Sequence, residues 1–536
     1  MKRIIFVLVV MLVPIMLFAQ TQRWVYRYSA PGNPGYDSAY AIAYGDDGNI
    51  YIAGRSVNSA GNPDFTVISL TPTGTERWVY RYISPNYWEG AYLITYGPDG
   101  NIYAVGTINN DSTILDNCDI AVVSLTPTGT LRWIYYYDGT YHGEDFPYSV
   151  VCGRDSNIYV CGYCTNSSPL WEDFTVLSLT PAGTQRWVYT YDGVGPGLDH
   201  ARSLVYGLDG NIYIAGTTSS SASNYNDFTV MKFSSSGTQR WMYKYDWPNA
   251  PDVAYAITYG TDNYIYAAGE IYGGSGYSYD FTVIKIDTSG TQQWVYRYAG
   301  TVNDWDEARA IIYGSDNNIY AAGTTWNTGT GNDITVISVN QAGNENWVYK
   351  LSNSTGWDYA WSLARIQNGN IYVAGDDGNF TTVNLTSVGS PRWVHIYNGP
   401  ASGGARSLVF GDDGNLYIAG YGEGTTNCDI VVISLDTVTA GIQELSSIRA
   451  TQPSFRISLG TFQNHNLSYT LSTPEPTTLK LSLYNISGEK IISWQNSFRK
   501  GNSHDTKAIP QIGPGVYFLS AETERGYKEN KKIIVF

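Results

Sequence analysis

One unit of sequence recurs along most of this 536-residue chain, and it constrains the fold more than any other feature. In its first copy the unit reads AYAIAYGDDGNIYIAG, then a loop, then DFTVISLTPTGTERWVYRY, then a second loop. The NIYxAG element or a close variant begins at Asn49, Asn101, Asn157, Asn211, Asn263, Asn318, Asn370 and Asn415. The tryptophan of RWVYRY recurs as Trp24, Trp78, Trp133, Trp187, Trp241, Trp294, Trp347 and Trp393. Eight copies predict a single array in which neighbouring units bury a shared core.

Each unit contains four short segments of alternating or β-branched residues, separated by Gly, Asp and Asn turns. This pattern predicts a four-stranded antiparallel meander and leaves no room for helices. Four-stranded units of this length are typical of propeller blades, so we predict an all-β, eight-bladed β-propeller. The array starts with a lone tryptophan strand at residues 24–28, and its last DIVVISL strand has none after it. We therefore expect the first strand to complete the eighth blade and close the ring.

Loop lengths predict how the two faces of this propeller differ. The connections after YG and after ISL are tight hairpins, whereas those after RWVYRY and after IYIAG are long and variable. Alternate connections of a meander emerge on the same side, so all the long loops should crowd one face. We call this the long-loop face. Variable loops on a rigid scaffold commonly carry binding sites, which makes this face the first place to look for function.

Charge and the N-terminal residues indicate an exported protein. Lys2 and Arg3 precede an apolar run that ends at Phe18, which predicts a secretory signal peptide over residues 1–19 and no transmembrane span. The formal charge of −15 disfavours nucleic acid as a partner. We expect the propeller to occupy residues 20–436 and a linker 437–452. Residues 453–536 contain 10 basic and 6 acidic residues, against 22 and 41 before them, which marks a second domain.

The repeat resembles secreted bacterial β-propeller repeat proteins over about residues 22–436. Its TG-x-x-x-W spacing, as in Thr73, Gly74 and Trp78, is similar to the tryptophan-docking repeat of eight-bladed quinoproteins. That resemblance is strong support for the fold and weak support for any particular chemistry. The adjacent cysteine pair expected in the quinone enzymes is missing, because Cys161 and Cys164 stand two residues apart. We therefore expect no cofactor.

The C-terminal segment reads as alternating strands, with a YNISGEKI hairpin and a final KKIIVF strand, which predicts a small β-sandwich. It closely resembles the C-terminal sorting domain of the type IX secretion system of Bacteroidetes-like Gram-negative bacteria. The residues that carry the resemblance are Tyr484, Gly488, Gly515, Val516, Tyr517, Lys531 and Lys532. It implies that the secretion machinery is a partner and that the protein passes through the periplasm to the outer cell surface or the medium.

Acidic residues stand in register just before the first strand of seven units: Asp37, Glu89, Asp145, Asp199, Asp252, Asp306 and Asp358. The eighth unit has Gly403 there. Because first strands of a propeller line its channel, these acids could ring the channel mouth. Alternatively, a carboxylate repeated in almost every blade accepts backbone N–H bonds from a loop, which is the interpretation we favour.

Departures from the repeat supply the candidate ligand-binding residues. Most first strands carry an aromatic residue three positions after the acid, but Arg202, Arg309 and Arg406 replace it in units four, six and eight. Tryptophans outside the repeat fall mainly in the long loops, and the candidates among them are Trp88, Trp247, Trp305, Trp357 and Trp361. Aromatic rings beside polar groups suit sugars, and they also anchor protein partners or form small loop cores.

We therefore expect a secreted, noncatalytic propeller that binds a glycan, another extracellular polymer or a protein through its long-loop face. The alternative from another class is a polysaccharide lyase or hydrolase that uses two of the mouth acids. The five histidines are widely separated, and the DDGN turns lack a full EF-hand ligand series, so we expect no metal site. A third possibility is a purely structural surface protein.

Overall fold

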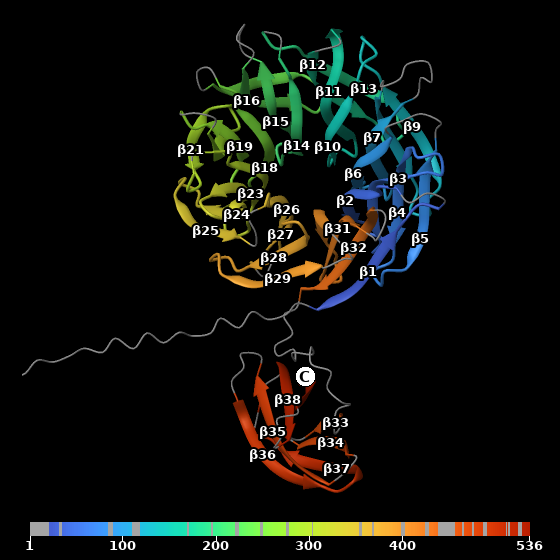
Figure 1. The fold of residues 1–536 in the computed structure, drawn as a ribbon, viewed down its shortest axis with the longest axis vertical. Coiled ribbons are helices and arrows are strands. Elements are labelled where there is room, and N and C mark those ends of the chain that lie inside the picture. Colours follow the sequence, from blue (N-terminus) through green and yellow to red (C-terminus); the bar gives the residue numbers. More distant parts are fainter. Residues whose placement is uncertain are drawn as a thin grey trace, which may run out of the picture. The chain divides into compact units, whose positions relative to one another are not determined.

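Blades of four antiparallel strands succeed one another around a central opening in the computed structural model (Figure 1). It describes residues 21–535 except 32–34, 84–88, 110–117, 169–170, 195–196, 220–224, 247–249, 275–277, 303, 353–355, 367–368, 398–401, 424–427, 438–455, 464–465, 474–475, 486–489, 511, 513–514 and 524–527. The predicted signal peptide and most of the predicted linker lie outside these residues. All 39 elements in the described part are strands.

The first four blades follow the predicted units, each with its strands in chain order from the inside of the ring to its rim. Blade one contains β2 (Ser38–Tyr44), β3 (Ile50–Val57), β4 (Pro63–Leu70) and β5 (Glu76–Tyr82). Blade two contains β6 (Gly90–Tyr96), β7 (Ile102–Ile108), β8 (Asp119–Leu125) and β9 (Leu131–Tyr137). Blade three contains β10 (Phe146–Cys152), β11 (Ile158–Ser168), β12 (Trp171–Leu179) and β13 (Gln185–Tyr191). Blade four contains β14 (His200–Tyr206), β15 (Asn211–Ser219), β16 (Asn226–Ser234) and β17 (Gln239–Tyr245).

The next three blades repeat this order, and the eighth differs only in the origin of its outer strand. Blade five contains β18 (Val253–Tyr259), β19 (Tyr264–Tyr272), β20 (Tyr279–Asp287) and β21 (Gln292–Tyr298). Blade six contains β22 (Glu307–Tyr313), β23 (Ile319–Asn327), β24 (Gly331–Val339) and β25 (Glu345–Leu351). Blade seven contains β26 (Tyr359–Arg365), β27 (Ile371–Asp376), β28 (Phe380–Leu385) and β29 (Pro391–Tyr397). Blade eight contains β30 (Gly403–Phe410), β31 (Asn415–Glu423), β32 (Cys428–Asp436) and, from the start of the chain, β1 (Gln22–Tyr28).

This arrangement confirms the predicted eight-bladed propeller and its closure by the N-terminal strand. β1 pairs antiparallel with β32, from Trp24 opposite Ser434 to Tyr28 opposite Ile430. The middle strands of each blade are almost wholly buried, because both faces of each blade pack against neighbouring blades. The eight blades therefore share one continuous series of apolar interfaces.

The TG-x-x-x-W spacing is explained by contacts between blades rather than within one. The Trp133 indole of blade two donates from Nε1 to the carbonyl oxygen of Pro181, in the turn of blade three, over 3.1 Å. In that turn Gly183 has φ +81°, and a Cβ there would lie 2.6 Å from the Trp133 ring. The same docking occurs for Trp24, Trp78, Trp187, Trp241, Trp294 and Trp347. The turn glycine thus provides the space into which the preceding blade inserts its tryptophan.

Gly183→Ala should therefore destabilise the propeller in two ways, through backbone strain and through a clash with the Trp133 ring. It should cost more than an alanine substitution at a glycine that has the same backbone strain but no neighbouring ring. Gly378 is the matched control, because it also has φ +81° but a Cβ there would meet no atom within 4 Å. We expect Gly378→Ala to cost about 1 kcal/mol of unfolding free energy, from the left-handed backbone. Displacing the Trp133 ring should add about 2 kcal/mol for Gly183→Ala. Denaturant unfolding of both variants measures the difference, and equal losses would contradict the docking role.

The C-terminal unit, Thr439–Phe536, is compact by itself. One sheet contains β33 (Arg456–Gln463), β34 (Asn466–Thr473) and β37 (Gly501–Ala508). The other contains β36 (Lys490–Phe498), β35 (Thr477–Asn485), β38 (Gly515–Thr523) and β39 (Lys528–Val535), in that order. Leu467 and Tyr469 of one sheet pack with Leu481 and Leu519 of the other in a single core. The predicted β-sandwich is therefore present.

Candidate functional site

A β-bulge occurs at the same place in all eight first strands. In β2, Ala39 pairs with Gly54 and Ala41 with Ala53, so Tyr40 has no partner in the ladder. The equivalent skipped residues are Tyr92, Tyr148, Arg202, Tyr255, Arg309, Trp361 and Arg406. We call these eight residues, Tyr40 included, the channel ring, because the first strands surround the central opening (Figure 1). Bulges redirect side chains and are frequent beside binding sites.

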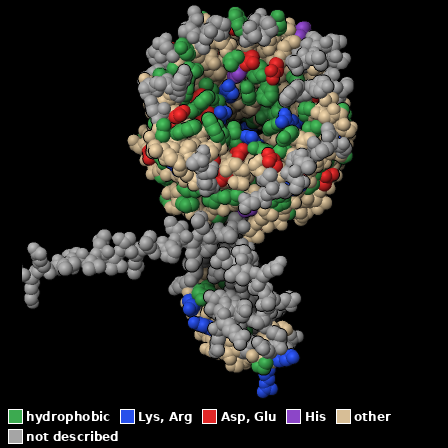
Figure 2. Space-filling view, viewed as in Figure 1, with side chains coloured by type: hydrophobic (Ala, Val, Ile, Leu, Met, Phe, Trp, Pro, Cys, Tyr) green, Lys and Arg blue, Asp and Glu red, His purple; other side chains and the backbone are tan. Residues whose placement is uncertain are grey.

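Six consecutive members of the channel ring alternate between aromatic rings and guanidinium groups. The Arg202 guanidinium carbon lies 5.0 Å from the Tyr148 ring centre and 5.3 Å from that of Tyr255. Arg309 follows, 4.1 Å from the centre of Tyr255 and 5.6 Å from that of Trp361. Arg406 then lies 4.5 Å from the centre of Trp361. Cation–π contacts thus link blades three to eight along the channel wall, and Figure 2 shows basic side chains around the central hollow.

The three arginines differ in their polar partners. Arg309 forms an ion pair with Glu307, with 2.7 Å between Nε and Oε1. Arg202 lies 3.1 Å from Nδ1 of His200, whose pKa is lowered by burial, so this partner is uncharged at neutral pH. Arg406 contacts the rings of Trp361 and Tyr421, and none of the described carboxylates lies within 4.0 Å of it. Among the described residues, Arg202 and Arg406 therefore have no ion-pair partner.

Glu270 is a buried acid beside this wall that the sequence analysis did not single out. It follows IYAAG in β19 and accepts hydrogen bonds from the Tyr255 hydroxyl, over 3.0 Å, and from the Trp305 indole. Burial and the nearby Glu307 raise its pKa well above the usual range. The sequence contains a pattern that could have revealed Glu270, because the residue after each IYxAG element differs between units. These residues are Arg55, Thr107, Tyr163, Thr217, Glu270, Thr324, Asp376 and Tyr421.

An aromatic strip leads from the long loops to the channel ring. Trp326 at the end of β23 meets Trp357 edge to face, with ring centres 5.5 Å apart. Trp357 stacks on Tyr359 at 6.3 Å, and Tyr359 stacks on Trp361 at 5.3 Å. We call these four residues the aromatic strip. Trp357 is 60% exposed, so the strip is open to solvent at its outer part and ends between Arg309 and Arg406 at its inner part.

The in-register acids are buried and hold loops. Asp306 accepts backbone N–H bonds from Gly300 and Trp326, each 2.6 Å long. Asp37 accepts from Ala30 at 2.8 Å and from Val57 at 2.6 Å. Asp145 and Asp199 each bond two backbone amides in the same way, and Asp252 bonds that of Tyr272. Glu89 and Asp358 are equally buried. This geometry fits the structural alternative and offers the hydrolase or lyase alternative no exposed carboxylate from this set.

The predicted tryptophans fall into three groups. Trp88 and Trp247 lie outside the described residues. Trp305 is 45% exposed and faces the Tyr279 ring at 5.5 Å, with its indole nitrogen on Glu270. Trp357 and Trp361 belong to the aromatic strip. The structure thus brings two predicted tryptophans and two predicted arginines together at one part of the channel mouth.

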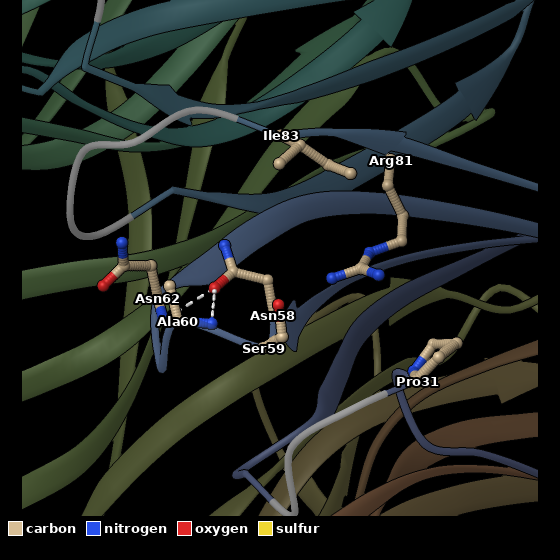
Figure 3. A pocket seen from close by; sticks show the side chains of 7 residues that line it. All are labelled: Pro31, Asn58, Ser59, Ala60, Asn62, Arg81 and Ile83. Atoms are coloured by element: carbon tan, nitrogen blue, oxygen red, sulfur yellow. Dashed lines mark hydrogen bonds between the residues drawn. The ribbon is translucent and has the colours of Figure 1, made fainter.

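A separate open pocket of about 500 Å³ lies beside blade one (Figure 3). Its lining includes Pro31, Asn58, Arg81 and Ile83, and Arg81 is ion-paired with buried Asp64 at 2.5 Å. The Asn58 side chain accepts hydrogen bonds from the backbone of the same short loop, as the dashed lines in Figure 3 show. The pocket contains none of the predicted site residues.

Two further clusters are chemically notable. Carboxylate oxygens of Asp119, Asp138 and Asp145 lie within 4.8 Å of one another, a grouping that sequence spacing did not reveal. Burial raises the pKa of Asp145 to about 7.

Cys161 and Cys164 are buried and unbridged. Burial raises the pKa of both thiols, which disfavours the thiolate that redox chemistry requires.

Comparison with known families identifies the C-terminal module. Residues 463–536 match the family described as a secretion system C-terminal sorting domain. The chain carries a type IX sorting domain. Residues 208–239, in blade four, match a β-propeller domain of unknown function, DUF5122. The protein is therefore a β-propeller exported by type IX secretion to the cell surface or the extracellular space. Among the described residues, no helix is long and apolar enough to cross a membrane.

Three solved structures with a similar arrangement of strands have little sequence identity with this chain. A Bacteroides caccae protein of unknown function is 12% identical, with a TM-score of 0.34, over 55% of this chain and 93% of its own. Chaetomium thermophilum Raptor is 8% identical, with a TM-score of 0.39, over 77% of this chain and 29% of its own. A eukaryotic initiation factor is also 8% identical, with a TM-score of 0.39, over 71% and 89%. No curated protein matches the sequence.

Proposed function

We propose that this protein is a secreted, noncatalytic binding protein that holds an extracellular polysaccharide on its long-loop face. The observation that carries the proposal is the aromatic strip, in which Trp326, Trp357, Tyr359 and Trp361 follow one another from solvent to the channel ring. The exposed Trp357 ring offers an apolar surface to a sugar residue, and Tyr359 and Trp361 continue this surface toward the channel ring.

Burial of the in-register acids favours binding over hydrolysis. A glycosidase needs two carboxyl groups that face the same bond across an open cleft. The in-register acids instead lie in different blades, and five of them, Asp37, Asp145, Asp199, Asp252 and Asp306, bind loop amides. Asp306 also binds the backbone amide of Trp326, which helps to hold the aromatic strip in position and so lowers the conformational cost of binding.

Trp357→Ala should weaken polysaccharide binding by about tenfold or more while leaving the fold intact. A stacked ring contributes roughly 1.5 kcal/mol beyond its buried area, and the exposed Trp357 contributes little to the propeller core. Affinity electrophoresis through gels that contain xylan, dextran, polygalacturonate or dextran sulfate measures the retardation. Trp171→Ala is the control, because Trp171 is an exposed tryptophan at the start of β12, away from the strip.

Thermal unfolding of the same variants separates this proposal from the loop-core alternative. If Trp357 serves mainly as a local core, Trp357→Ala should lower the melting temperature and leave retardation unchanged. Absence of retardation of the wild-type protein by every polymer in the set would refute polysaccharide binding itself.

A further inference from the structure

We infer that the channel ring selects acidic polysaccharides, with Arg406 and Arg202 binding carboxylate or sulfate groups of the sugar chain. This inference rests on the proposed function, since it specifies the ligand class for the same face. Its starting point is the placement of arginine in blades four, six and eight at a bulged position where the other blades have aromatic residues. The protein as a whole carries a charge of −15, so three basic groups around one opening are an exception to its composition.

The contacts of these two arginines are mainly with aromatic rings, and neither forms an ion pair with a described carboxylate. Arg406 rests on the Trp361 ring at 4.5 Å and the Tyr421 ring at 5.3 Å, and none of the described carboxylates pairs with it. Arg202 lies between the Tyr148 and Tyr255 rings, its Nε atom is buried without an acceptor, and it contacts His200, which in turn is bonded to Glu172. A guanidinium held against aromatic faces presents its N–H groups at its edge, where a planar carboxylate or a sulfate is bound by two parallel hydrogen bonds.

Nearby acids are already occupied and do not neutralise these two arginines directly. Glu307 pairs with Arg309. Glu270 accepts from Tyr255 and Trp305, and its raised pKa favours the neutral form. Asp376 accepts from the Tyr421 hydroxyl at 3.0 Å and from the Gly378 amide at 3.1 Å. Each of these carboxylates therefore has hydrogen-bond or ion-pair partners of its own, and within the described residues none lies within 4.0 Å of Arg202 or Arg406, although Asp376 is close enough to Arg406 to act on it electrostatically.

The aromatic strip connects this charge to the sugar platform. Trp361 is both the last ring of the strip and the ring on which Arg406 lies. A sugar stacked along Tyr359 and Trp361 would bring a substituent on its edge to Arg406 on one side and Arg309 on the other. Neutral sugars would use the platform alone, so the acidic substituent adds affinity that depends on these arginines.

The test compares polymers that differ only in charge, using the full mature chain. Polygalacturonate is set against its methyl ester, which lacks the free carboxylates, and dextran sulfate against dextran. We expect at least tenfold tighter binding to one acidic polymer than to its neutral counterpart, and weaker binding as sodium chloride is raised from 50 to 500 mM. The acidic polymer that is preferred identifies carboxylate or sulfate as the group bound.

Arg406→Gln should reduce binding to the acidic polymer about 10- to 100-fold, the usual effect of removing a hydrogen-bonded charge pair. Arg202→Gln should have an effect of the same sign. Arg240→Gln is the matched control, since it removes the same charge from an exposed position on β17, outside the channel ring. Melting temperatures establish that all three variants fold.

The two proposals fail in different ways. Equal binding to acidic and neutral polymers by a wild-type protein that Trp357→Ala impairs would overturn the charge selectivity and leave polysaccharide binding standing. Loss of acidic-polymer binding in Arg240→Gln equal to that in Arg406→Gln would also overturn it, because general surface charge would then be responsible. Failure of every polymer to bind would refute both proposals.

Discussion

Deletion of residues 453–536 is expected to leave the propeller folded in the periplasm and to remove it from the cell surface and the medium. The sorting-domain match covers residues 463–536, within the deleted segment. The propeller lies in a separate compact unit, Met1–Val438. The deletion therefore removes none of the residues that form this unit. Fractionation of cells, with immunodetection of the propeller in each fraction, measures the outcome. Normal extracellular levels of the truncated protein would contradict the assignment of the export signal.

Two lysine pairs refine this experiment. The resemblance assigns Lys531 and Lys532, in the last strand β39, to the sorting signal. Lys531→Ala with Lys532→Ala should therefore reduce export strongly. Lys480→Ala with Lys500→Ala removes the same charge from exposed positions of the same sandwich and should leave export unchanged. Equal loss in both double variants would indicate that net basic charge, rather than the terminal strand, is recognised.

The repeat predicted the propeller because each of its levels points to the same structure. Turn residues define four strands per unit, the docking spacing defines the contact between units, and the lone tryptophan strand defines how the ring closes. The docking depends on residues in two successive units, because the tryptophan of one unit packs against the turn glycine of the next. Trp133 and Gly183 illustrate this, and their 50-residue separation could be recognised only by comparing successive units.

The candidate site was predicted less completely, because its geometry depends on bulges and on contacts between non-equivalent residues. The three arginines were found as departures from the repeat, but their cation–π partners follow from the bulge that turns each of them toward the next blade. Glu270 and Tyr421 were missed, although they occupy one variable position after IYxAG. The acids were detected by their regularity, which in blades one, three, four, five and six is explained by the loop amides that these carboxylates bind.

Deletion of residues 22–28 should destabilise the propeller more than any single substitution considered above. β1 supplies the outer strand of blade eight, and its backbone pairs with β32 from Trp24 to Tyr28. Trp24 also docks on blade one, donating to the carbonyl oxygen of Pro72 over 3.0 Å. The deleted strand buries parts of Trp24, Val25, Tyr26 and Tyr28, worth roughly 6 kcal/mol at about 1.5 kcal/mol for each side chain. We expect a melting temperature lower by roughly 10 °C and increased aggregation through the exposed edge of β32.

Point variants and a peptide distinguish ring closure from a general effect of shortening the chain. Arg23→Ala removes only two ion-pair contacts at 4.0 Å, so its melting temperature should stay within about 1 °C of the parent. Arg27→Ala should have an intermediate effect, because Arg27 pairs with Asp429 at 2.8 Å and donates to the Gly422 carbonyl oxygen. A synthetic peptide of residues 20–30 should restore much of the lost stability by occupying the vacant edge of β32. Unchanged melting after the deletion would show that the ring holds together without its N-terminal strand. If the deletion lowers the melting temperature and the peptide does not restore it, the lost stability does not come from the pairing of β1 with β32.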